Sequence, residues 1–440
     1  MQIRKLFFFL LLNFCFLLFL TSCSVTKQIS KQADTILLKD SAIRTGHIGI
    51  SIYEPATNTY WYNHNATNYF IPASNTKLFT LYAGMKYLGD SLVGLRYQVH
   101  KISSETITEI TPTGDPTFLL PEFSHQAVLE FLGRQKEILI NKLPYLNPLG
   151  MGWAWDDHQE TYMAPRSVFP MYGNVVKIKW LNKANLSIYP EYFRKESDMT
   201  DSFDSGFNLI KKIGSNHLVF TSGFEKNKDI TFESDLLTGI NLLKDTLNIA
   251  NIAYTNGYLT QKDNKDKIIY SQSTDSLFKP MMHRSDNFFA EQTLLMVSNE
   301  YLGYMSDEKI IDTLLTTDLK DIPQKPRWVD GSGLSRYNLF SPQSFIYILN
   351  KSKNEFGFDR LKNILATGGT GTLSNYYRNA GGFIYAKTGT LSNNCALSGF
   401  LITKKGKLLI FSVLANNYIS GATPVRRAVE RFLLGIREKY

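Results

Sequence analysis

The stretch "IPASNTKLFTLYAGMKYLG", residues 71–89, constrains the fold of this chain more than any other. From about Ser74 to Leu88 the residues follow a helical pattern, and Gly89 then favours the end of a helix. Large apolar side chains cover most of the circumference of this helix. We therefore expect a helix that is buried on nearly all sides.

Ser74 stands at the start of this helix, and Lys77 follows three positions later. A hydroxyl at a helix start lies beside unpaired backbone N–H groups and the positive end of the helix dipole, which favours an anion forming there. Side chains three positions apart lie on the same face. If the apolar neighbours bury Lys77, desolvation lowers its pKa, and the neutral amine can take the proton of Ser74. The spacing thus permits a nucleophile and its base on one turn.

Ser-x-x-Lys is a weak signal by itself, because serine is a common helix cap and other pairs in the chain share the spacing. Two further motifs follow it in order. Ser285–Asn287 in "HRSDNFF" forms an S-D-N element, and Lys387–Gly389 in "YAKTGTLS" forms a K-T-G element that occurs once. The ordered set S-x-x-K, S-D-N and K-T-G is the signature of penicillin-recognising serine acyl-enzymes.

The surrounding sequences narrow the resemblance. "IPASNTKLFT", "SDNFFAEQ", "DGSGLSRYN", "GTGTLSN", "AKTGTLS" and "LSGFL", with "GDPTF" and "WAWDDHQETYMAPRSVF", resemble class C low-molecular-mass penicillin-binding proteins over residues 45–435. These are serine-type D-alanyl-D-alanine carboxypeptidases that also act as endopeptidases. The resemblance implies an α/β (α+β) fold, with a penicillin-binding and serine β-lactamase-like transpeptidase core. In that core an antiparallel sheet is flanked by helices, and a helical subdomain and a β-rich inserted domain are added.

The resemblance also implies roles for the motif residues. Ser74 would attack the carbonyl of the penultimate D-alanine, with Lys77 as the acylation base. Ser285 would relay a proton to the leaving amine, and Asn287 would bind the peptide backbone of the substrate and Lys77. The asparagine Asn75 departs from the small hydroxyl residue that the family more often has.

The third motif would bind the end of the substrate. Lys387, with Thr388 and Thr390, would attract the terminal carboxylate that D-Ala-D-Ala peptides and penicillins share. The oxyanion hole would come from the backbone N–H groups of Ser74 and Thr390. Gly389 fits this role, because a side chain there would obstruct close approach.

The chain divides into segments that differ in residue composition and pattern. We predict a signal peptide over residues 1–22, a polar tether over 23–45, and a catalytic domain over 46–94 and 231–440. Short strand-like runs, turns and aromatic clusters predict a β-rich insertion over 95–230. "GHIGISIYEPATNTYWYN" reads as a hairpin, and the last section predicts two antiparallel strands and a closing helix.

Asp330, Gly331 and Ser332 match the family, but a tight turn before a helix starting at Ser341–Pro342 explains them at least as well as a catalytic role, so we leave them out of the site. Cys395 lies in an apolar strand pattern and reads as a core residue without a chemical role.

The first residues have the layout of an export signal, because Arg4 and Lys5 precede an apolar block that closes on small residues. "LTSC" resembles a lipobox, which implies that Cys23 is lipidated and becomes the first mature residue. A plain transmembrane anchor is the alternative, but the apolar run is shorter than the roughly 20 residues that a bilayer requires. With Ser24 rather than Asp after the cysteine, we expect a periplasmic lipoprotein of the outer membrane.

The expected partners are peptidoglycan stem peptides, β-lactam antibiotics as covalent inhibitors, and the membrane that holds the lipid anchor. The formal net charge of +9 suits anionic envelope surfaces, whereas nucleic acid is not expected, since the basic residues form no long block. We expect no cofactor and no metal, because the 7 histidines are scattered without ligand spacing. Self-association stays open.

Two alternatives remain for the function. A β-lactamase or esterase on the same scaffold would need a water-activating group, and none can be assigned from the sequence. A non-catalytic peptidoglycan-binding lipoprotein would have no need of the Ser74–Lys77 pair.

Overall fold

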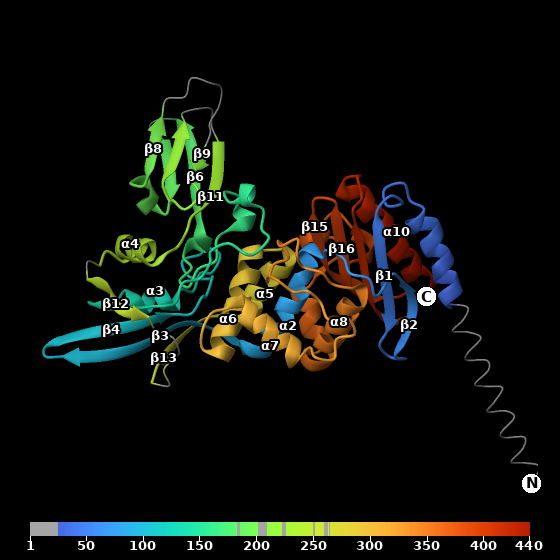
Figure 1. Ribbon diagram of the computed structural model, residues 1–440, viewed down its shortest axis with the longest axis horizontal. Coiled ribbons are helices and arrows are strands. Elements are labelled where there is room, and N and C mark those ends of the chain that lie inside the picture. Colours follow the sequence, from blue (N-terminus) through green and yellow to red (C-terminus); the bar gives the residue numbers. More distant parts are fainter. Residues whose placement is uncertain are drawn as a thin grey trace, which may run out of the picture. The chain divides into compact units, whose positions relative to one another are not determined.

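The computed structural model describes residues 25–440 except 183–184, 201–208, 222–225, 250, 259–262 and 264 (Figure 1). The described residues form two compact units. The terminal unit contains the chain up to Leu78, Asp321–Trp328 and Asn338–Tyr440, and the middle unit contains Phe79–Lys320 and Val329–Tyr337. The predicted signal peptide and Cys23 lie outside the described residues.

The terminal unit is built on a six-stranded sheet with the order β14-β15-β16-β17-β1-β2. All neighbouring strands are antiparallel. The strands are β1 (His47–Glu54), β2 (Thr59–His64), β14 (Ala366–Thr367), β15 (Ile384–Leu391), β16 (Asn394–Ile402) and β17 (Leu408–Asn416). The predicted hairpin, the two late strands and the antiparallel sheet of the core are therefore confirmed.

Helices cover both faces of this sheet. Ile48 and Ile50 on β1 are buried in one cluster with Phe432 of α10 (Ala422–Lys439), so they point to the α10 face. Gly49 between them points to the opposite face, where a Cβ would lie 2.8 Å from Pro342 at the start of α8 (Pro342–Phe356). The short helix α9 (Phe358–Ile364) and the turns η7 (Gly371–Leu373) and η8 (Arg378–Ala380) lead into β15.

The segment after the predicted signal is helical where it is described. Residues 25–33 form a helix that continues into the π-helical turn η1 (Asp34–Leu38). Ile29, Ala33 and Leu37 are buried in the same cluster as α10, beside which this segment runs in Figure 1. The predicted polar tether therefore includes an amphipathic helix, whose apolar side becomes apparent only once α10 is placed against it.

The Ser74 helix is close to its prediction. It opens with a 3-10 turn, η2 (Ala73–Thr76), continues as α2 (Lys77–Tyr87) and is followed by Gly89, whose φ is +66°. Every residue from Thr76 to Met85 is buried, as the apolar circumference predicts. In the middle unit α2 packs against two helices at Gly84, since a Cβ on this residue would lie under 3.0 Å from side-chain atoms of Phe278 and Thr293.

The helices of the middle unit include α5 (Thr274–His283), α6 (Asn287–Leu302) and α7 (Asp307–Thr316). Twelve consecutive residues of α6, Phe288–Asn299, are buried. Such a helix lies inside its unit and can hold polar side chains rigidly.

The rest of the middle unit is rich in strands. A five-stranded sheet has the order β12-β5-β4-β3-β13, and two three-stranded sheets have the orders β8-β10-β9 and β11-β6-β7. The strands are β3 (Ser91–Ile102), β4 (Glu105–Pro112), β5 (Ile138–Lys142), β6 (Val175–Asn182), β7 (Asn185–Tyr189), β8 (Ser197–Thr200), β9 (Leu209–Lys211), β10 (Leu218–Thr221), β11 (Lys226–Thr231), β12 (Ile252–Tyr258) and β13 (Lys267–Ser273), with the helices α3 (Ala127–Leu132) and α4 (Leu236–Leu247) among them. The remaining 3-10 turns are η3 (Trp155–Asp157), η4 (Thr161–Met163), η5 (Tyr172–Asn174) and η6 (Glu191–Arg194).

The largest of these sheets extends beyond residue 230, where we predicted the insertion to end. β12 pairs in parallel with β5, and β13 pairs with β3, although more than a hundred residues separate each pair along the chain. Pairing over such distances has no local sequence signal, because the residues of a strand do not show which distant strand it will pair with. The exact limits of the inserted domain stay a prediction.

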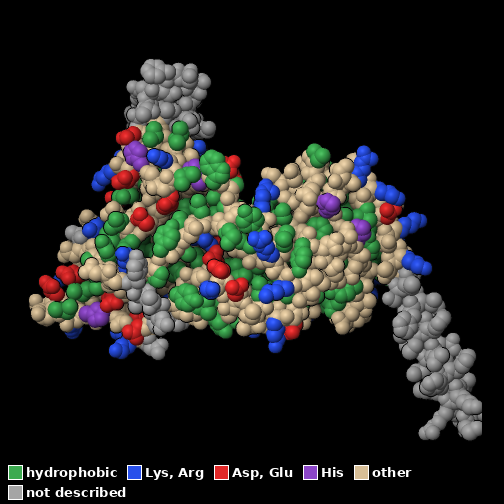
Figure 2. All heavy atoms as spheres, in the orientation of Figure 1, with side chains coloured by type: hydrophobic (Ala, Val, Ile, Leu, Met, Phe, Trp, Pro, Cys, Tyr) green, Lys and Arg blue, Asp and Glu red, His purple; other side chains and the backbone are tan. Residues whose placement is uncertain are grey.

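The surface carries its charges unevenly. In Figure 2 Lys and Arg side chains gather over the part of the terminal unit that α10 and the N-terminal helix occupy. This agrees with the basic residues in the α10 sequence "ATPVRRAVERFLLGIREK".

Candidate active site

Ser74 and Lys77 meet as the spacing predicts. The Nζ atom of Lys77 donates a hydrogen bond to Ser74 Oγ over 2.9 Å. Lys77 is fully buried, whereas Ser74 is partly exposed and can be reached by a substrate. Ala73, directly before the serine, has a φ of +48°, a left-handed conformation that is strained for a residue with a Cβ. The turn therefore holds the hydroxyl outward on a fixed backbone with the amine behind it.

The K-T-G strand lies against this turn. A Cβ on Gly389 would lie 2.4 Å from the carbonyl oxygen of Pro72 and 3.1 Å from the backbone N of Ser74. Only glycine lets β15 approach the turn so closely. At Gly389 it is therefore the Ser74 turn that approaches the strand closely. The N–H group of Ser74 lies at this contact.

Lys387 is the second buried lysine of the terminal unit. Its Nζ donates to the carbonyl oxygen of Thr388 over 2.8 Å. Burial lowers the pKa of Lys387 well below its usual value, and the positive charges of Lys77 and Arg426 lower it further. Positive charge on Lys77 or Arg426 therefore disfavours the protonated form of Lys387, and an arriving anion would relieve this repulsion.

Asn75, the residue that departs from the family pattern, ties the turn to the sheet. It is fully buried, and its amide bonds Ser398 Oγ on β16 over 2.8 Å. With the amide nitrogen turned toward β15, Asn75 donates to the Lys387 carbonyl over 2.6 Å. Our sequence reasoning gave Asn75 no role. Its place directly after the nucleophile, at the start of a helix predicted to be buried, was a usable signal, because a buried amide needs hydrogen-bond partners.

Thr388 and Thr390 share one side of β15, while Lys387 and Gly389 share the other, because side chains alternate along a strand. Thr388 is buried and Thr390 is exposed at the strand end. The strand thus presents its hydroxyl groups and its lysine from different faces.

Ser285 and Asn287 belong to the middle unit. Ser285 lies between α5 and α6 with a φ of +63°, and Asp286 caps α6 by accepting from the N–H of Phe289 over 2.9 Å. The amide of Asn287 donates to the carbonyl oxygen of Tyr162 over 2.7 Å. The left-handed serine is a second strained position at a motif. That these two residues meet Ser74 stays a prediction.

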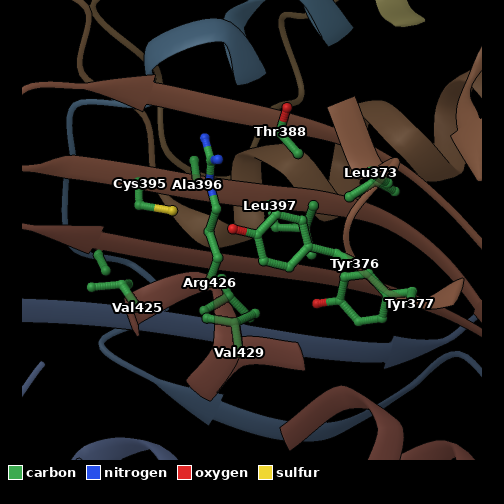
Figure 3. Close-up of a pocket in the computed structure, with 12 residues that line it drawn as sticks. Leu373, Tyr376, Tyr377, Thr388, Cys395, Ala396, Leu397, Val425, Arg426 and Val429 are labelled. Atoms are coloured by element: carbon green, nitrogen blue, oxygen red, sulfur yellow. The ribbon is translucent and has the colours of Figure 1, made fainter. Parts of the chain in front are cut away.

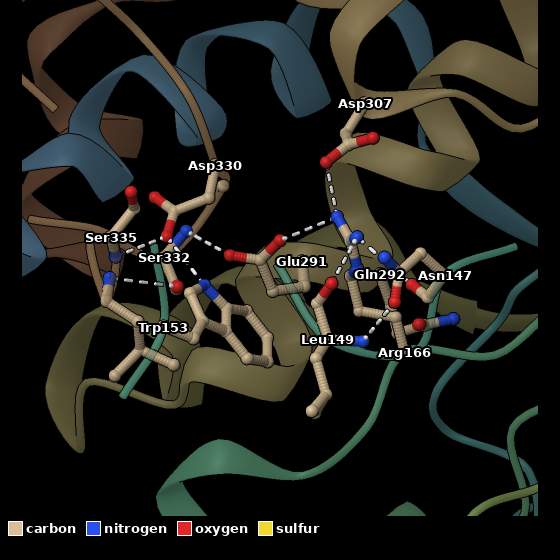
Figure 4. Close-up of polar contacts among 12 residues, drawn as sticks. Asn147, Leu149, Trp153, Arg166, Glu291, Gln292, Asp307, Asp330, Ser332 and Ser335 are labelled. Carbon is tan, nitrogen blue, oxygen red and sulfur yellow. Dashed lines mark hydrogen bonds and ion pairs between the residues drawn. The ribbon is translucent and has the colours of Figure 1, made fainter. Parts of the chain in front are cut away.

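The segment 330–335 is a turn held by a buried carboxylate (Figure 4). Asp330 accepts from the N–H groups of Gly333 and Ser335 over 2.8 and 2.7 Å, and from Trp153 Nε1 over 3.0 Å. Ser341 caps α8 with Pro342 at its first position. The expected turn before the helix is therefore present.

A buried acid network continues from this turn. Glu291 on α6 accepts the N–H of Ser332 over 2.7 Å, and its other oxygen lies 3.7 Å from Arg166, which also pairs with Asp307 (Figure 4). Burial, together with the negative charge of Asp330, raises the pKa of Glu291 to about 7, although the positive charge of Arg166 opposes both. The network connects α6 and α7 to the loop before β6.

Cys395 is a buried free thiol on β16, as expected of a core residue. The described residues contain no group of three or more His, Cys, Asp or Glu side chains suited to a metal ion. None of the described helices combines the length and the apolar character that crossing a membrane requires.

Comparison with known proteins agrees with this geometry. Residues 29–433 match the D-Ala-D-Ala carboxypeptidase 3 (S13) family. The chain is 22% identical to the D-alanyl-D-alanine carboxypeptidase DacB of Haemophilus influenzae, over 82% of this chain and 83% of that protein.

Solved structures show the same fold. Penicillin binding protein 4 (dacB) of Haemophilus influenzae has a TM-score of 0.73 at 18% identity, over 93% of this chain and 99% of that chain. A penicillin G-acylated predatory endopeptidase of Bdellovibrio bacteriovorus has a TM-score of 0.50 at 14% identity, over 90% of this chain and 96% of that chain. Since the family match spans nearly all of the chain and includes the three motifs, the chain belongs to the D-Ala-D-Ala carboxypeptidase (S13) family of serine peptidases.

Proposed function

We propose that this chain removes the terminal D-alanine from peptidoglycan stem peptides through an acyl-enzyme on Ser74. The observation that carries the proposal is the hydrogen bond of 2.9 Å between Lys77 Nζ and Ser74 Oγ, on a turn that β15 touches at Gly389. The family match supplies the substrate class, because the family is defined by D-Ala-D-Ala carboxypeptidases.

Acylation begins at the Ser74 hydroxyl. Oγ attacks the carbonyl carbon of the penultimate D-alanine while its proton passes to the neutral amine of Lys77. The oxyanion is stabilised by the backbone N–H groups of Ser74 and Thr390. The peptide C–N bond then breaks, and Ser285 relays a proton to the amine of the leaving D-alanine. In the second half of the reaction water attacks the ester, with Lys77 as the base, and Ser74 is regenerated.

The same steps explain two related reactions. A β-lactam presents a strained amide beside a carboxylate, so Ser74 would open the ring and retain the acyl group. In a cross-linked stem peptide the leaving amine belongs to a neighbouring strand, and cleavage is then an endopeptidase reaction. The endopeptidase relative that is acylated by penicillin G supports both extensions.

The test is mass spectrometry of the protein after penicillin treatment, together with D-alanine release from a D-Ala-D-Ala peptide. The adduct should lie on the peptide that contains Ser74. Ser74→Ala should remove the adduct and lower D-alanine release by at least about 10⁴-fold. Ser276→Ala is a matched control, because Ser276 also precedes a lysine by three positions but is exposed on α5. An adduct elsewhere contradicts the mechanism, and penicillin turnover faster than peptide turnover would point to a β-lactamase.

We further propose that the protein is a lipoprotein anchored at Cys23 on the periplasmic side of the outer membrane. The lipobox-like "LTSC" and Ser24 support this address. Metabolic labelling with a fatty acid should mark the wild-type protein, and Cys23→Ala should abolish the label and leave the protein in the cytoplasmic membrane as an uncleaved precursor. Equal labelling of both proteins would exclude Cys23 as the anchor.

A further inference from the structure

A cation outside the three motifs contacts the end of the K-T-G strand. Arg426, in the second turn of α10, donates from Nη2 to the hydroxyl of Thr390. Arg426 and Thr388 line one small hollow of the terminal unit, with a cavity volume of about 20 Å³. In Figure 3 the arginine extends past Ala396, and its guanidinium lies between Cys395 and Thr388. The two threonines that we assign to the substrate carboxylate therefore share their side of the strand with a third polar group.

The surroundings of Arg426 leave its charge available for an anion. The side chain is half-buried, and the groups against it are the Cys395 thiol and the Tyr376 ring, whose centroid lies 5.8 Å from the guanidinium. Among the ion pairs of the described residues none includes a carboxylate with Arg426. Its neighbour Arg427 differs, since it pairs with Glu430 over 2.6 Å. Half-buried cations are usually neutralised by a partner, and a substrate carboxylate would complete this one.

The direction of the hydrogen bond also matters. A guanidinium has donors only, so the oxygen of Thr390 must accept from Arg426. The hydroxyl hydrogen of Thr390 is then left to point elsewhere, toward any acceptor on the open side of the strand. A carboxylate is such an acceptor, whereas an amide in its place presents an N–H₂ group and only one oxygen.

We propose that Arg426 is a positioning residue that selects substrates with a free carboxylate on the leaving residue, by holding the Thr390 hydroxyl as a donor and adding its positive charge. This inference rests on the proposed function and adds to it a residue from α10.

The experiment compares two peptides that differ only at the C-terminus, an N-acylated D-Ala-D-Ala and its C-terminal amide. Arg426→Gln should lower kcat/KM for the free acid about 10- to 100-fold, mainly through KM, as expected for the loss of a charge-assisted hydrogen bond. For the amide, kcat/KM should change less than about threefold, since the amide lacks the charge that the arginine recognises. Arg426→Lys should restore part of the selectivity, because it keeps the charge.

Arg427→Gln is the matched control, since it removes the same charge one position along α10 and should leave both peptides unchanged. The acylation rates of penicillin G and its methyl ester provide a second acid and neutral pair for the same variants. Equal losses on the acid and the neutral compound, or equal effects of Arg426→Gln and Arg427→Gln, would overturn the inference and leave Arg426 with a structural role. A wild-type protein that forms no adduct on Ser74 would instead contradict the proposed function, and the inference with it.

Discussion

The terminal and middle units both bury charged side chains, but they arrange them in opposite ways. In the terminal unit basic side chains lie near other basic side chains, and the charges of Lys77 and Arg426 lower the pKa of Lys387. In the middle unit Glu291 lies between an acid, Asp330, and a cation, Arg166. The first arrangement opposes folding and favours an incoming anion, whereas the second joins several segments through opposite charges and backbone N–H groups.

This difference separates residues that serve the reaction from residues that hold the fold. Active sites accumulate groups that cost stability, because a substrate completes them. A buried acid that accepts several backbone N–H groups instead fixes a turn. Removing charges from the two units should therefore have opposite consequences for activity and for stability.

The largest effect should come from Lys387→Met in the terminal unit. Acylation by penicillin should fall by about 10³-fold, because a preorganised charge near the substrate is lost. The unfolded chain binds the lysine proton more tightly than the folded chain does, since the pKa of Lys387 is lowered on folding from 10.5. The wild type therefore loses stability as the pH falls below that value, and the variant should be more stable at neutral pH by about 1 kcal/mol.

Stopped-flow acylation and urea unfolding measure these two changes. If Lys387→Met lowers the free energy of unfolding instead of raising it, the lysine serves the structure of the terminal unit. The contrast between the two units then fails.

Asp330→Ala should show the reverse behaviour. It leaves Trp153 Nε1 and the N–H groups of Gly333 and Ser335 without their acceptor, so the free energy of unfolding should fall by about 3 kcal/mol. Penicillin acylation by the folded fraction should stay within about tenfold of the wild type, as one turn is lost rather than a reacting group. Asp312→Ala, which removes an exposed carboxylate from α7, is the control and should do neither. Loss of acylation without loss of stability would place Asp330 in the reaction.

The smallest effect concerns pH. Because burial raises the pKa of Glu291 from 4.5 to about 7, the folded protein binds this proton more tightly than the unfolded chain. The stabilisation is complete below 4.5 and is lost as the pH rises through 7, by roughly 3 kcal/mol. Glu291→Gln cannot titrate and should show a flatter profile of stability against pH between 5 and 8, measured by urea unfolding at each pH. Parallel profiles for the two proteins would mean that the acid network is already charge-balanced throughout this range.

Much of the site could be predicted because its signals are local. The Ser74–Lys77 turn, the strand around Lys387 and the turn at Asp330 each lie within a few residues of one another, where spacing determines geometry. The family resemblance added their order and implied the antiparallel sheet of the terminal unit, and apolar runs indicated its hairpin and its two late strands.

The rest depended on partners that are distant in the sequence. Arg426 reaches Thr390 from another element, and the pairing of β12 with β5 joins segments on either side of α4. Neither contact has a local sequence pattern. A basic residue on an amphipathic helix usually faces solvent, and the sequence of a short strand does not show which strand it pairs with. Asn75 was visible, but its bonds to Lys387 and Ser398 became apparent only when the strands were placed.

The packed helix at residues 25–38 has a consequence for where such an enzyme can work. If Cys23 carries the lipid that we propose, only Ser24 stands in the sequence between the lipidated residue and the helix of residues 25–33, which is buried with α10. A long flexible linker would let the reactive serine reach cell wall throughout the depth of the envelope. So short a linker would confine the serine to the layer of wall nearest the lipid headgroups.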